Sequence, residues 1–490
     1  MPRARRTTRR RARARGATAA VAAAAAAALG GATATPAAAE PPGAQTVLIS
    51  RTPAGAPANG PSANPVISQD QRFARVVAFE SAASDIAPGA TAGISNVYVA
   101  TRAQPYGDNG TPWGFAQAQL ISRGLDGQPA DGPSRLPAVD GSSGTAPSCA
   151  AFVSAATNLV PGDTNGVADA FVASLSTGEI TRVSVSASGA QANGPTTQVA
   201  VDGRCTRVAF TSTATNLALT RTSRPSWKSA RTTSGGGRRQ VYVRAIGGTD
   251  AHERALRGLT FLASARGGRA GDGDSFDPVL SSRGRSLAFT TRARSLGGGP
   301  PPGVSQIYLR RLDRRTRPER AGGRRVQGLR LTTVLVSAAA GKPGDGPSAD
   351  PAINAAEDTL AYQTRATNLA EGNRAGIPRI IRTKVAGAAR KHAWMSSRGG
   401  RLGDRPSREP TMTDDGHWVF FTTEAPDLRP PGDLGQAPEI LFNAFPWVVS
   451  SGPDDRPLTA GAAHPDTSPQ GNYVVFDSGG LVLLRYLGRR

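Results

Sequence analysis

Residues 207–217 carry the segment that decides the fold, Arg-Val-Ala-Phe-Thr-Ser-Thr-Ala-Thr-Asn-Leu. Successive side chains of an extended chain point to opposite sides, so Val208, Phe210 and Ser212 share one side. The alternation of β-forming residues predicts a strand, which residues 214–217 follow as a short polar tail.

Versions of this strand return along the whole chain, roughly 55 to 80 residues apart, which is near the spacing of propeller and solenoid repeats. The seven copies centre on Phe79, Phe152, Phe210, Phe289, Tyr362, Phe421 and Phe476. Close matches to the tail stand at residues 156–159 and 366–369, looser versions follow three more copies, and the seventh copy has none. One repeated sheet unit is therefore predicted.

A second segment precedes each Phe-centred strand and is opened by proline in six copies. These prolines are Pro65, Pro137, Pro278, Pro351, Pro410 and Pro465. Proline lacks the N–H that a ladder needs, so we expect it at the first residue of a strand. Glycines such as Gly203, Gly284, Gly416 and Gly471 stand between the two segments, and they predict tight hairpins with positive φ.

Two more strands complete each copy. The third strands are predicted at residues 97–99, 170–172, 241–243, 307–309, 379–381, 440–442 and 481–483. The fourth strands are predicted at residues 120–122, 183–185, 261–263, 334–336, 393–395 and 447–449. The last copy lacks a fourth strand, and residues 46–50, Thr-Val-Leu-Ile-Ser, form a strand without a blade. Pairing them would close a ring and remove two sheet edges.

Together these marks resemble the TolB-type, WD-like β-propeller repeat over residues 46–490. The resemblance implies an all-β fold, a single propeller domain of seven mostly four-stranded blades. Six blades is the alternative, if the short last copy merges with the first. The resemblance also implies protein interaction outside the cytoplasm, although a fold by itself does not define a function.

Residues 1–39 have the composition of a targeting segment. Eight arginines form a basic end, and a short alanine-rich stretch leads to small residues at Ala37-Ala38-Ala39. The Arg9-Arg10 pair suggests twin-arginine export, with general secretion as the alternative. Residues 40–45 form a short linker. No later stretch is apolar enough to cross a bilayer, so we expect an exported monomer, secreted or associated with the cell envelope.

The formal net charge of +22 still leaves +14 once those eight arginines are removed. Such an excess suits an anionic cell-envelope polymer, and the alternative is an arginine-rich genomic composition. Basic residues crowd two stretches expected to be solvated loops, 219–239 and 310–330. Trp227 is the only aromatic residue of the first stretch, whereas nucleic-acid platforms use several stacking rings. We therefore do not expect nucleic-acid binding.

One loop is rich in side-chain oxygens. Asp163, Asn165 and Asp169 have a spacing that suits calcium, but no bidentate glutamate follows at the expected distance. The alternative is a turn whose Asp and Asn side chains bond neighbouring backbone groups. No other cofactor is expected.

Cys149 and Cys205 are the only cysteines, and both stand just before Phe-centred strands of neighbouring copies. An even number in an exported protein permits one disulfide, whose formation the sequence alone leaves open.

Several catalytic patterns are missing from the sequence. His252, His392, His417 and His464 stand apart in separate copies, which gives a zinc site no support, and no Gly-x-Ser-x-Gly elbow occurs. We therefore predict a non-enzymatic scaffold that binds a protein or an anionic envelope polymer. The alternative is a carbohydrate-active hydrolase or lyase in the central channel. Two channel acids from different blades within roughly 5 to 10 Å would favour the enzyme.

Overall fold

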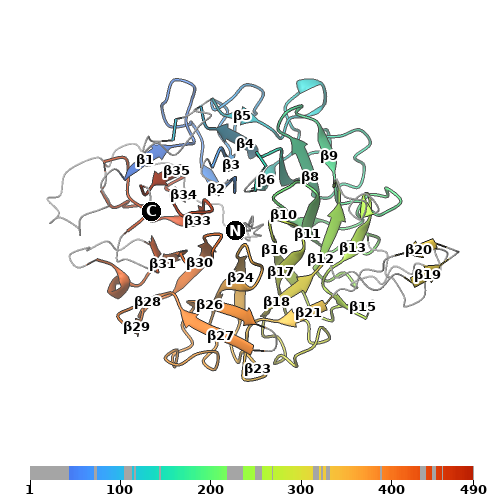
Figure 1. Cartoon of the computed structure of the whole chain (residues 1–490). Coiled ribbons are helices and arrows are strands. Elements are labelled where there is room, and N and C mark those ends of the chain that lie inside the picture. Colours follow the sequence, from blue (N-terminus) through green and yellow to red (C-terminus); the bar gives the residue numbers. More distant parts are fainter. Residues whose placement is uncertain are drawn as a thin grey trace, which may run out of the picture.

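A computed structural model shows seven small sheets that radiate from one axis (Figure 1). It describes residues 44–70, 74–103, 113–114, 117–142, 145–217, 236–248, 256–267, 269–312, 319–321, 324–326, 332–386, 389–430, 438–443, 448–454 and 456–488. The predicted targeting segment lies outside this part of the chain. So do most of the linker, residues 218–235 of the basic insertion with Trp227, and His252.

Each blade is an antiparallel meander whose first strand lies nearest the axis (Figure 1). Blades one to four are β2 (Ser62–Ile67), β3 (Val76–Ser81), β4 (Asn96–Thr101) and β5 (Gln119–Leu120); β6 (Ser134–Val139), β7 (Cys149–Ser154), β8 (Asp169–Ser174) and β9 (Ile180–Arg182); β10 (Thr196–Val201), β11 (Arg207–Ser212), β12 (Gln240–Ala245) and β13 (Thr260–Leu262); and β16 (Ser275–Leu280), β17 (Ser286–Thr291), β18 (Gln306–Arg311) and β21 (Thr332–Leu335). Blades five to seven are β24 (Ser348–Ile353), β25 (Thr359–Thr364), β26 (Arg379–Ala386) and β27 (Ala389–Trp394); β30 (Ser407–Met412), β31 (Val419–Thr423) and β32 (Glu439–Phe442); and β33 (Ala463–Thr467), β34 (Tyr473–Ser478), β35 (Leu481–Tyr486) and β1.

The N-terminal strand closes the ring. β1 (Gln45–Leu48) pairs antiparallel with β35, with Val47 opposite Leu484 and Leu48 opposite Leu483. The seven-bladed propeller with this closure is therefore confirmed, and the six-bladed alternative is wrong, because the last copy keeps its own sheet.

The remaining described elements lie between or outside the blades. Short hairpins pair β14 (Ala265–Arg266) with β15 (Arg269–Ala270), β19 (Glu319–Ala321) with β20 (Arg324–Val326), β22 (Ala338–Ala339) with β23 (Lys342–Pro343) and β28 (Ser397–Arg398) with β29 (Arg401–Leu402). Two one-turn 3₁₀ helices are η1 (Leu125–Gly127) and η2 (Pro426–Leu428). None of the helices in the described ranges is long and apolar enough to cross a bilayer.

The repeated aromatic residues form the core between blades. All seven are at most 2 % exposed, as the period-two pattern predicted. Phe79, Phe152, Phe210 and Phe289 each stack on a ring of the third strand in the same blade, with centroids 5.6 to 6.2 Å apart. Neighbouring blades share buried clusters; Phe79 of blade one and Tyr473 of blade seven, for example, belong to one cluster.

The predicted place of the prolines is wrong. The inner strands begin two or three residues earlier, as β2 does at Ser62 for Pro65. Each proline follows a β-bulge instead, and the residue before it has positive φ. Those residues are Asn64, Leu136, Asp277, Asp350, Glu409 and His464, with φ of 50 to 58°. A bulge interrupts the ladder, so the missing proline N–H is tolerated in mid-strand. In the third copy the turn residue with positive φ is Cys205, not Gly203.

A buried serine recurs in all seven blades and was not predicted. Its Oγ accepts the N–H of a third-strand residue, at 2.9 to 3.0 Å in every case. The seven serines are Ser122, Ser184, Ser264, Ser337, Ser396, Ser450 and, in the closing segment, Ser50. In blade six Ser450 keeps this bond although the described residues form only three strands there, and the fourth strand predicted at 447–449 begins outside the described residues. The serine thus replaces a ladder bond where the outer strand ends.

Replacing one of these serines is expected to cost stability without changing the fold. In Ser337→Ala the N–H of Ile307 loses its acceptor in a fully buried place, and Gln306 loses the hydroxyl that bonds its side chain at 2.6 Å. We expect the free energy of unfolding to fall by about 1 to 3 kcal/mol in urea titrations. The exposed Ser176→Ala serves as control, and equal stability of the two variants would contradict the role given to Ser337.

Candidate functional site

The inner strands carry a ring of polar side chains around the axis. Each bulge frees a backbone N–H, and a side chain of the preceding blade accepts it in five places. The donors and acceptors are Asn64 to Asp477 (2.9 Å), Leu136 to Glu80 (2.6 Å), Asp277 to Gln198 (2.9 Å), Asp350 to Asp277 (3.4 Å) and His464 to Glu409 (2.8 Å). The ring therefore joins neighbouring blades, and most of its acceptors are acids.

No residue of this ring was predicted, although the sequence held a signal. All five donors stand directly before one of the prolines of the repeated second segment, and Asp277 and Asp350 are acids at the same place in the repeat. What the sequence could not reveal is that a bulge turns the backbone N–H of this position toward the preceding blade.

Two of these acids influence each other's ionisation. Burial and, second to it, the neighbouring charge of Asp350 raise the pKa of Asp277 to about 6. Hydrogen bonds from Gln198 and Thr290, at 2.8 and 3.1 Å, act in the opposite direction without cancelling the rise.

This pair should make stability depend on pH. Between about pH 4 and 6 the folded chain holds a proton on Asp277 that the unfolded chain has released, so stability falls as pH rises through that window. In Asp277→Asn the unfolding free energy should no longer fall in this way as pH rises. The measurement is the difference in unfolding free energy between the variant and wild type at pH 4, 5, 6 and 7.

Asp131 provides a control of opposite sign. Slight burial acts to raise the pKa of Asp131, but hydrogen bonds from Thr157 outweigh it and lower this pKa. The stabilising contribution of Asp131 is therefore lost as pH falls. A difference between wild type and Asp277→Asn that does not vary with pH would contradict the assignment.

Blades six and seven meet at a group of three side chains, those of Glu409, His464 and Asp477. Oδ2 of Asp477 lies 2.6 Å from Nδ1 of His464, and Oε1 of Glu409 lies 3.8 Å from its Nε2. The hydrogen bond between Nδ1 of His464 and Asp477 fixes the orientation of the ring and leaves Nε2 facing Glu409.

A cavity of about 250 Å³ lies beside this group. Arg408, Glu409, Glu424 and Asp477 line it, together with Ser478 and Gly479. Ser478 ends β34, and Gly479 begins the tight turn that stands where other copies have their tail. The missing tail of the seventh copy therefore leaves a polar cavity between blades six and seven.

Two acids near the axis bear on whether the central channel holds an enzyme site. Glu409 and Asp477 come from different blades and contact opposite nitrogens of one imidazole, which places them within the roughly 5 to 10 Å that a glycosidase pair requires. The imidazole of His464, however, fills the space between them in which a glycosidic bond would have to lie.

The structure gathers the predicted calcium residues around an arginine. Arg182 Nη1 lies 2.7 Å from Asp163 Oδ1 and 3.3 Å from Asp169 Oδ2, and Asn165 Nδ2 donates to Asp169 at 2.7 Å. Asp169 also accepts a hydrogen bond from Ser184, one of the repeated serines. Calcium here stays a prediction, and the ion would have to displace the guanidinium.

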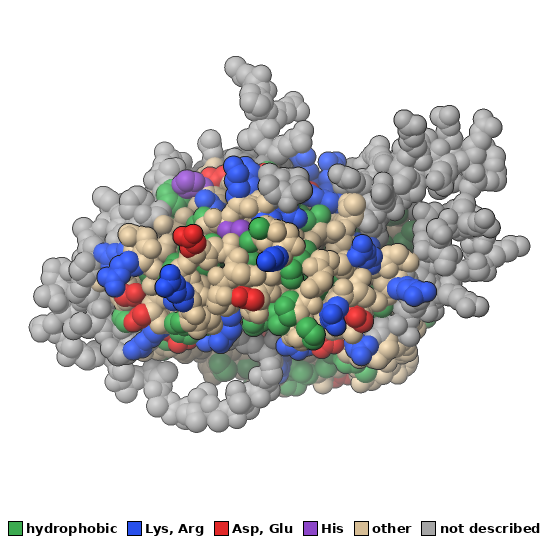
Figure 2. All heavy atoms as spheres, turned by 90° about the horizontal axis from the view of Figure 1, so that it is seen from below, with side chains coloured by type: hydrophobic (Ala, Val, Ile, Leu, Met, Phe, Trp, Pro, Cys, Tyr) green, Lys and Arg blue, Asp and Glu red, His purple; other side chains and the backbone are tan. Residues whose placement is uncertain are grey.

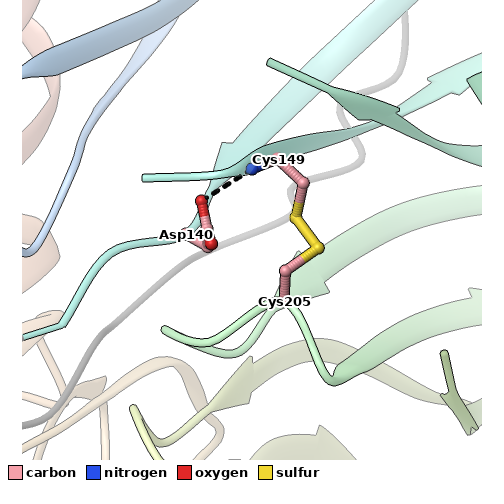
Figure 3. A group of neighbouring side chains, drawn as sticks. All are labelled: Asp140, Cys149 and Cys205. Atoms are coloured by element: carbon pink, nitrogen blue, oxygen red, sulfur yellow. Dashed lines mark hydrogen bonds between the residues drawn. A yellow bond between two sulfur atoms is a disulfide. The ribbon is translucent and has the colours of Figure 1, made fainter. Parts of the chain in front are cut away.

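Cys149 and Cys205 lie in blades two and three and are joined, with Sγ–Sγ at 1.97 Å and Cα–Cα at 6.2 Å (Figure 3). Asp140 lies beside them and accepts the N–H of Cys149 at 2.9 Å. Among the described residues these three are the one group close enough to share a metal ion, but each sulfur is bonded to the other.

The other predicted residues are dispersed. His392 bonds Thr383 and the Ala338 carbonyl, and His417 packs edge-on against Trp418. Trp113 is buried and donates to the carbonyl of Ala74. On the face seen in Figure 2, Lys and Arg side chains are spread among other types and form no single patch.

The basic stretch 310–330 needs a correction at its start. It was expected to be a solvated loop, yet Arg310 belongs to β18 and is only 5 % exposed.

No protein-family model matches the chain, and no curated protein matches it in sequence. Solved structures with a similar fold include TolB from Acinetobacter baumannii, with 13 % identity, a TM-score of 0.32, and coverage of 65 % of this chain and 59 % of that one. A prolyl endopeptidase has 12 % identity, a TM-score of 0.44 and coverage of 86 % and 45 %. An acylaminoacyl peptidase of Pyrococcus horikoshii has 9 % identity, a TM-score of 0.41 and coverage of 88 % and 52 %. The chain thus spans about three fifths of that TolB and about half of the peptidases. It is a seven-bladed β-propeller, and TolB propellers are among the solved structures that it resembles.

Proposed function

We propose that the protein is exported and acts as a non-enzymatic scaffold, which binds a protein partner through the face that carries the repeated tails. This tail face consists of the tails after the Phe-centred strands and the Asp- or Asn-headed turns that bond to them. The proposal rests on one observation, the repeated set of hydrogen bonds that orders this face before any partner binds.

In blade two, Asp131 accepts the N–H and the hydroxyl of Thr157 at 2.7 and 2.5 Å, and Asn158 accepts the N–H of Asp131 at 3.1 Å. Blade five repeats the same bonds through Asp345, Thr367 and Asn368. Related bonds tie Asn59 to Ser84, Asn193 to Thr215, Asp272 to Arg294 and Asp404 to Asp427. Loops fixed in this way lose little conformational freedom when a partner binds.

The cavity between blades six and seven gives this face an anchor point. Because the seventh copy lacks a tail, the cavity interrupts the ordered loops, and Glu409, Glu424 and Asp477 line it with carboxylates. A lysine or arginine side chain of a partner has the charge that suits such a lining.

The test is retention of envelope proteins on the immobilised chain, compared between two charge reversals. Glu424 is 38 % exposed at the cavity rim, and we expect Glu424→Lys to reduce retention of a specific partner about ten-fold or more. Asp415→Lys makes the same charge change in a turn at the opposite end of the strands, and it should retain the partner. Equal loss in both variants would refute binding through the tail face.

An anionic cell-envelope polymer is the second candidate partner, favoured by the formal net charge of +14 that remains without the eight arginines of residues 1–39. Binding to such a polymer should persist at 150 mM salt and be lost gradually as salt rises. Complete loss at moderate salt, with every polymer alike, would indicate unspecific attraction.

The second candidate function is that of a carbohydrate-active hydrolase or lyase. The meeting of Glu409 and Asp477 on one imidazole favours it, and the imidazole's position between them opposes it. Turnover of a polysaccharide that disappears in Glu409→Gln, with the fold intact, would establish it.

A further inference from the structure

A second cavity, of about 860 Å³, lies at the outer rim of blade four, within the size range of ligand pockets. This rim pocket is formed by three segments, which are the hairpin that holds Arg266, the strands β18 and β21 of blade four, and Arg390 on β27 of blade five. Gly297 and Gly298, both with positive φ, form part of its wall. It therefore joins three arginines that are far apart in the sequence.

Arg310 is the central residue of the rim pocket, and among the described residues no carboxylate forms an ion pair with its buried charge. Its side chain is 5 % exposed, and its hydrogen bonds run through Nη1 to two neutral oxygens, those of Ala265 (2.6 Å) and the Thr333 hydroxyl. Its Nε is buried and has no partner among the described residues. Burial lowers the pKa of Arg310 to about 10, which agrees with the lack of a nearby acid.

The repeat itself supplies a comparison. Arg244 occupies the same position on the third strand of blade three, and its Nη1 has four neutral acceptors, which include the Val185 and Gly258 carbonyls at 3.2 and 3.1 Å. At that position the protein itself provides the acceptors of the guanidinium. At Arg310 fewer acceptors are present and a cavity lies alongside, so the difference marks a place for an outside acceptor.

Other groups of the rim pocket suit the same ligand. Arg266 is exposed, and its guanidinium lies against Gly297. Arg390 donates through Nε and Nη2 to the Leu335 carbonyl, both at 3.2 Å, which holds its charge at the pocket. The hydroxyl of Thr332 is buried without a partner in the described chain. Tyr308 and Leu335 add an apolar wall large enough for a ring.

We propose that the rim pocket binds an oxyanion group, a carboxylate, sulfate or phosphate, carried on a unit the size of a sugar. Arginine forks match the planar or tetrahedral oxygens of such groups, and a buried guanidinium gains most from them. This site goes beyond the proposed function, because it stands at the rim rather than on the tail face. Its ligand has two sources, a free acidic sugar or the same unit within an anionic polymer.

The experiment titrates the full chain by calorimetry with glucuronate and with glucose 6-phosphate, and uses glucose as the neutral control. We expect saturable binding of one acidic sugar per chain and none of glucose. Arg310→Met is expected to weaken the affinity about ten-fold or more. Arg266→Met, at an exposed position that the fold does not need, should weaken it several-fold. Arg244→Met, the change at the equivalent, half-buried position of blade three, should leave the affinity unchanged.

The two sources are separated by a competition arm with a soluble polymer of glucuronate units. If the polymer binds and glucuronate displaces it, both ligands bind at the rim pocket. Polymer binding that Arg310→Met and Arg266→Met leave unchanged would overturn the rim site while the proposed envelope binding survives. Failure of both acidic sugars to bind at millimolar concentration, or equal weakening by Arg244→Met and Arg266→Met, would also overturn it.

Discussion

A chain that begins at Arg51 instead of Ala44 is expected to lose about 5 kcal/mol or more of unfolding free energy, a large share of what holds most domains folded. The deletion removes the four ladder pairs between β1 and β35 and the fully buried Ile49, a side chain whose truncation alone typically costs about 2 to 5 kcal/mol. It also removes the hydroxyl of Ser50, which accepts the N–H of Val482 at 2.9 Å, and leaves Arg485 without the Thr46 hydroxyl.

The measurement is urea unfolding followed by circular dichroism, with the chain from Ala44 as the matched control. That control keeps β1 and should match the longer chain in stability. If the chain from Arg51 unfolded at the same urea concentration, the N-terminal strand would be an accessory and not part of blade seven.

Phe210→Ala is expected to cost about 3 to 5 kcal/mol. Phe210 is fully buried, stacks on Tyr242 with centroids 5.6 Å apart, and packs with Val199 and Val208 in the core shared by blades two and three. Removing the ring leaves a cavity bounded by two sheets, which can collapse only if the blades move together.

Leu125→Ala gives the comparison for this change. Leu125 is 41 % exposed on the short helix η1, so its truncation should change the unfolding free energy by less than about 0.5 kcal/mol. Comparable losses in both variants would mean that the repeated aromatic positions do not form the inter-blade core.

The sequence was sufficient for the architecture because the deciding pattern is local and repeated. Each Phe-centred strand shows its alternating pattern within five residues. The ring closure followed from counting strands, because the last copy had one strand too few and the N-terminal end had one strand without a blade. The inner strand was harder. Proline suggested a strand start, whereas a bulge with positive φ at the preceding residue lets proline stand in the middle of β2.

The repeated serines were hidden by composition. Serine is common in the turns of this chain, so a buried serine at one place in each repeat does not stand out until the third and fourth strands are paired. Aligning the fourth strands would have placed Ser122, Ser264 and Ser337 in one column.

The two cavities could not be predicted for a different reason. The rim pocket combines residues 266, 310 and 390, whose proximity depends on how neighbouring blades are turned against each other. Arg310 was assigned to a solvated stretch because arginines follow it, yet its place on β18 opposite Leu287 and Thr333 determines its burial. The channel acids likewise acquire their hydrogen-bond donors from the next blade.

The central claim is that the N-terminal strand belongs to the last blade, and disulfide trapping tests it most directly. Val47 and Leu484 lie opposite each other in the β1–β35 ladder, close enough for cysteines to be joined after slight adjustment. Oxidised Val47→Cys/Leu484→Cys should yield the peptide linking residues 47 and 484 in nearly every molecule, whereas Val47→Cys/Leu287→Cys should yield none. Absence of the 47–484 link in folded protein, with both cysteines free, would contradict the account.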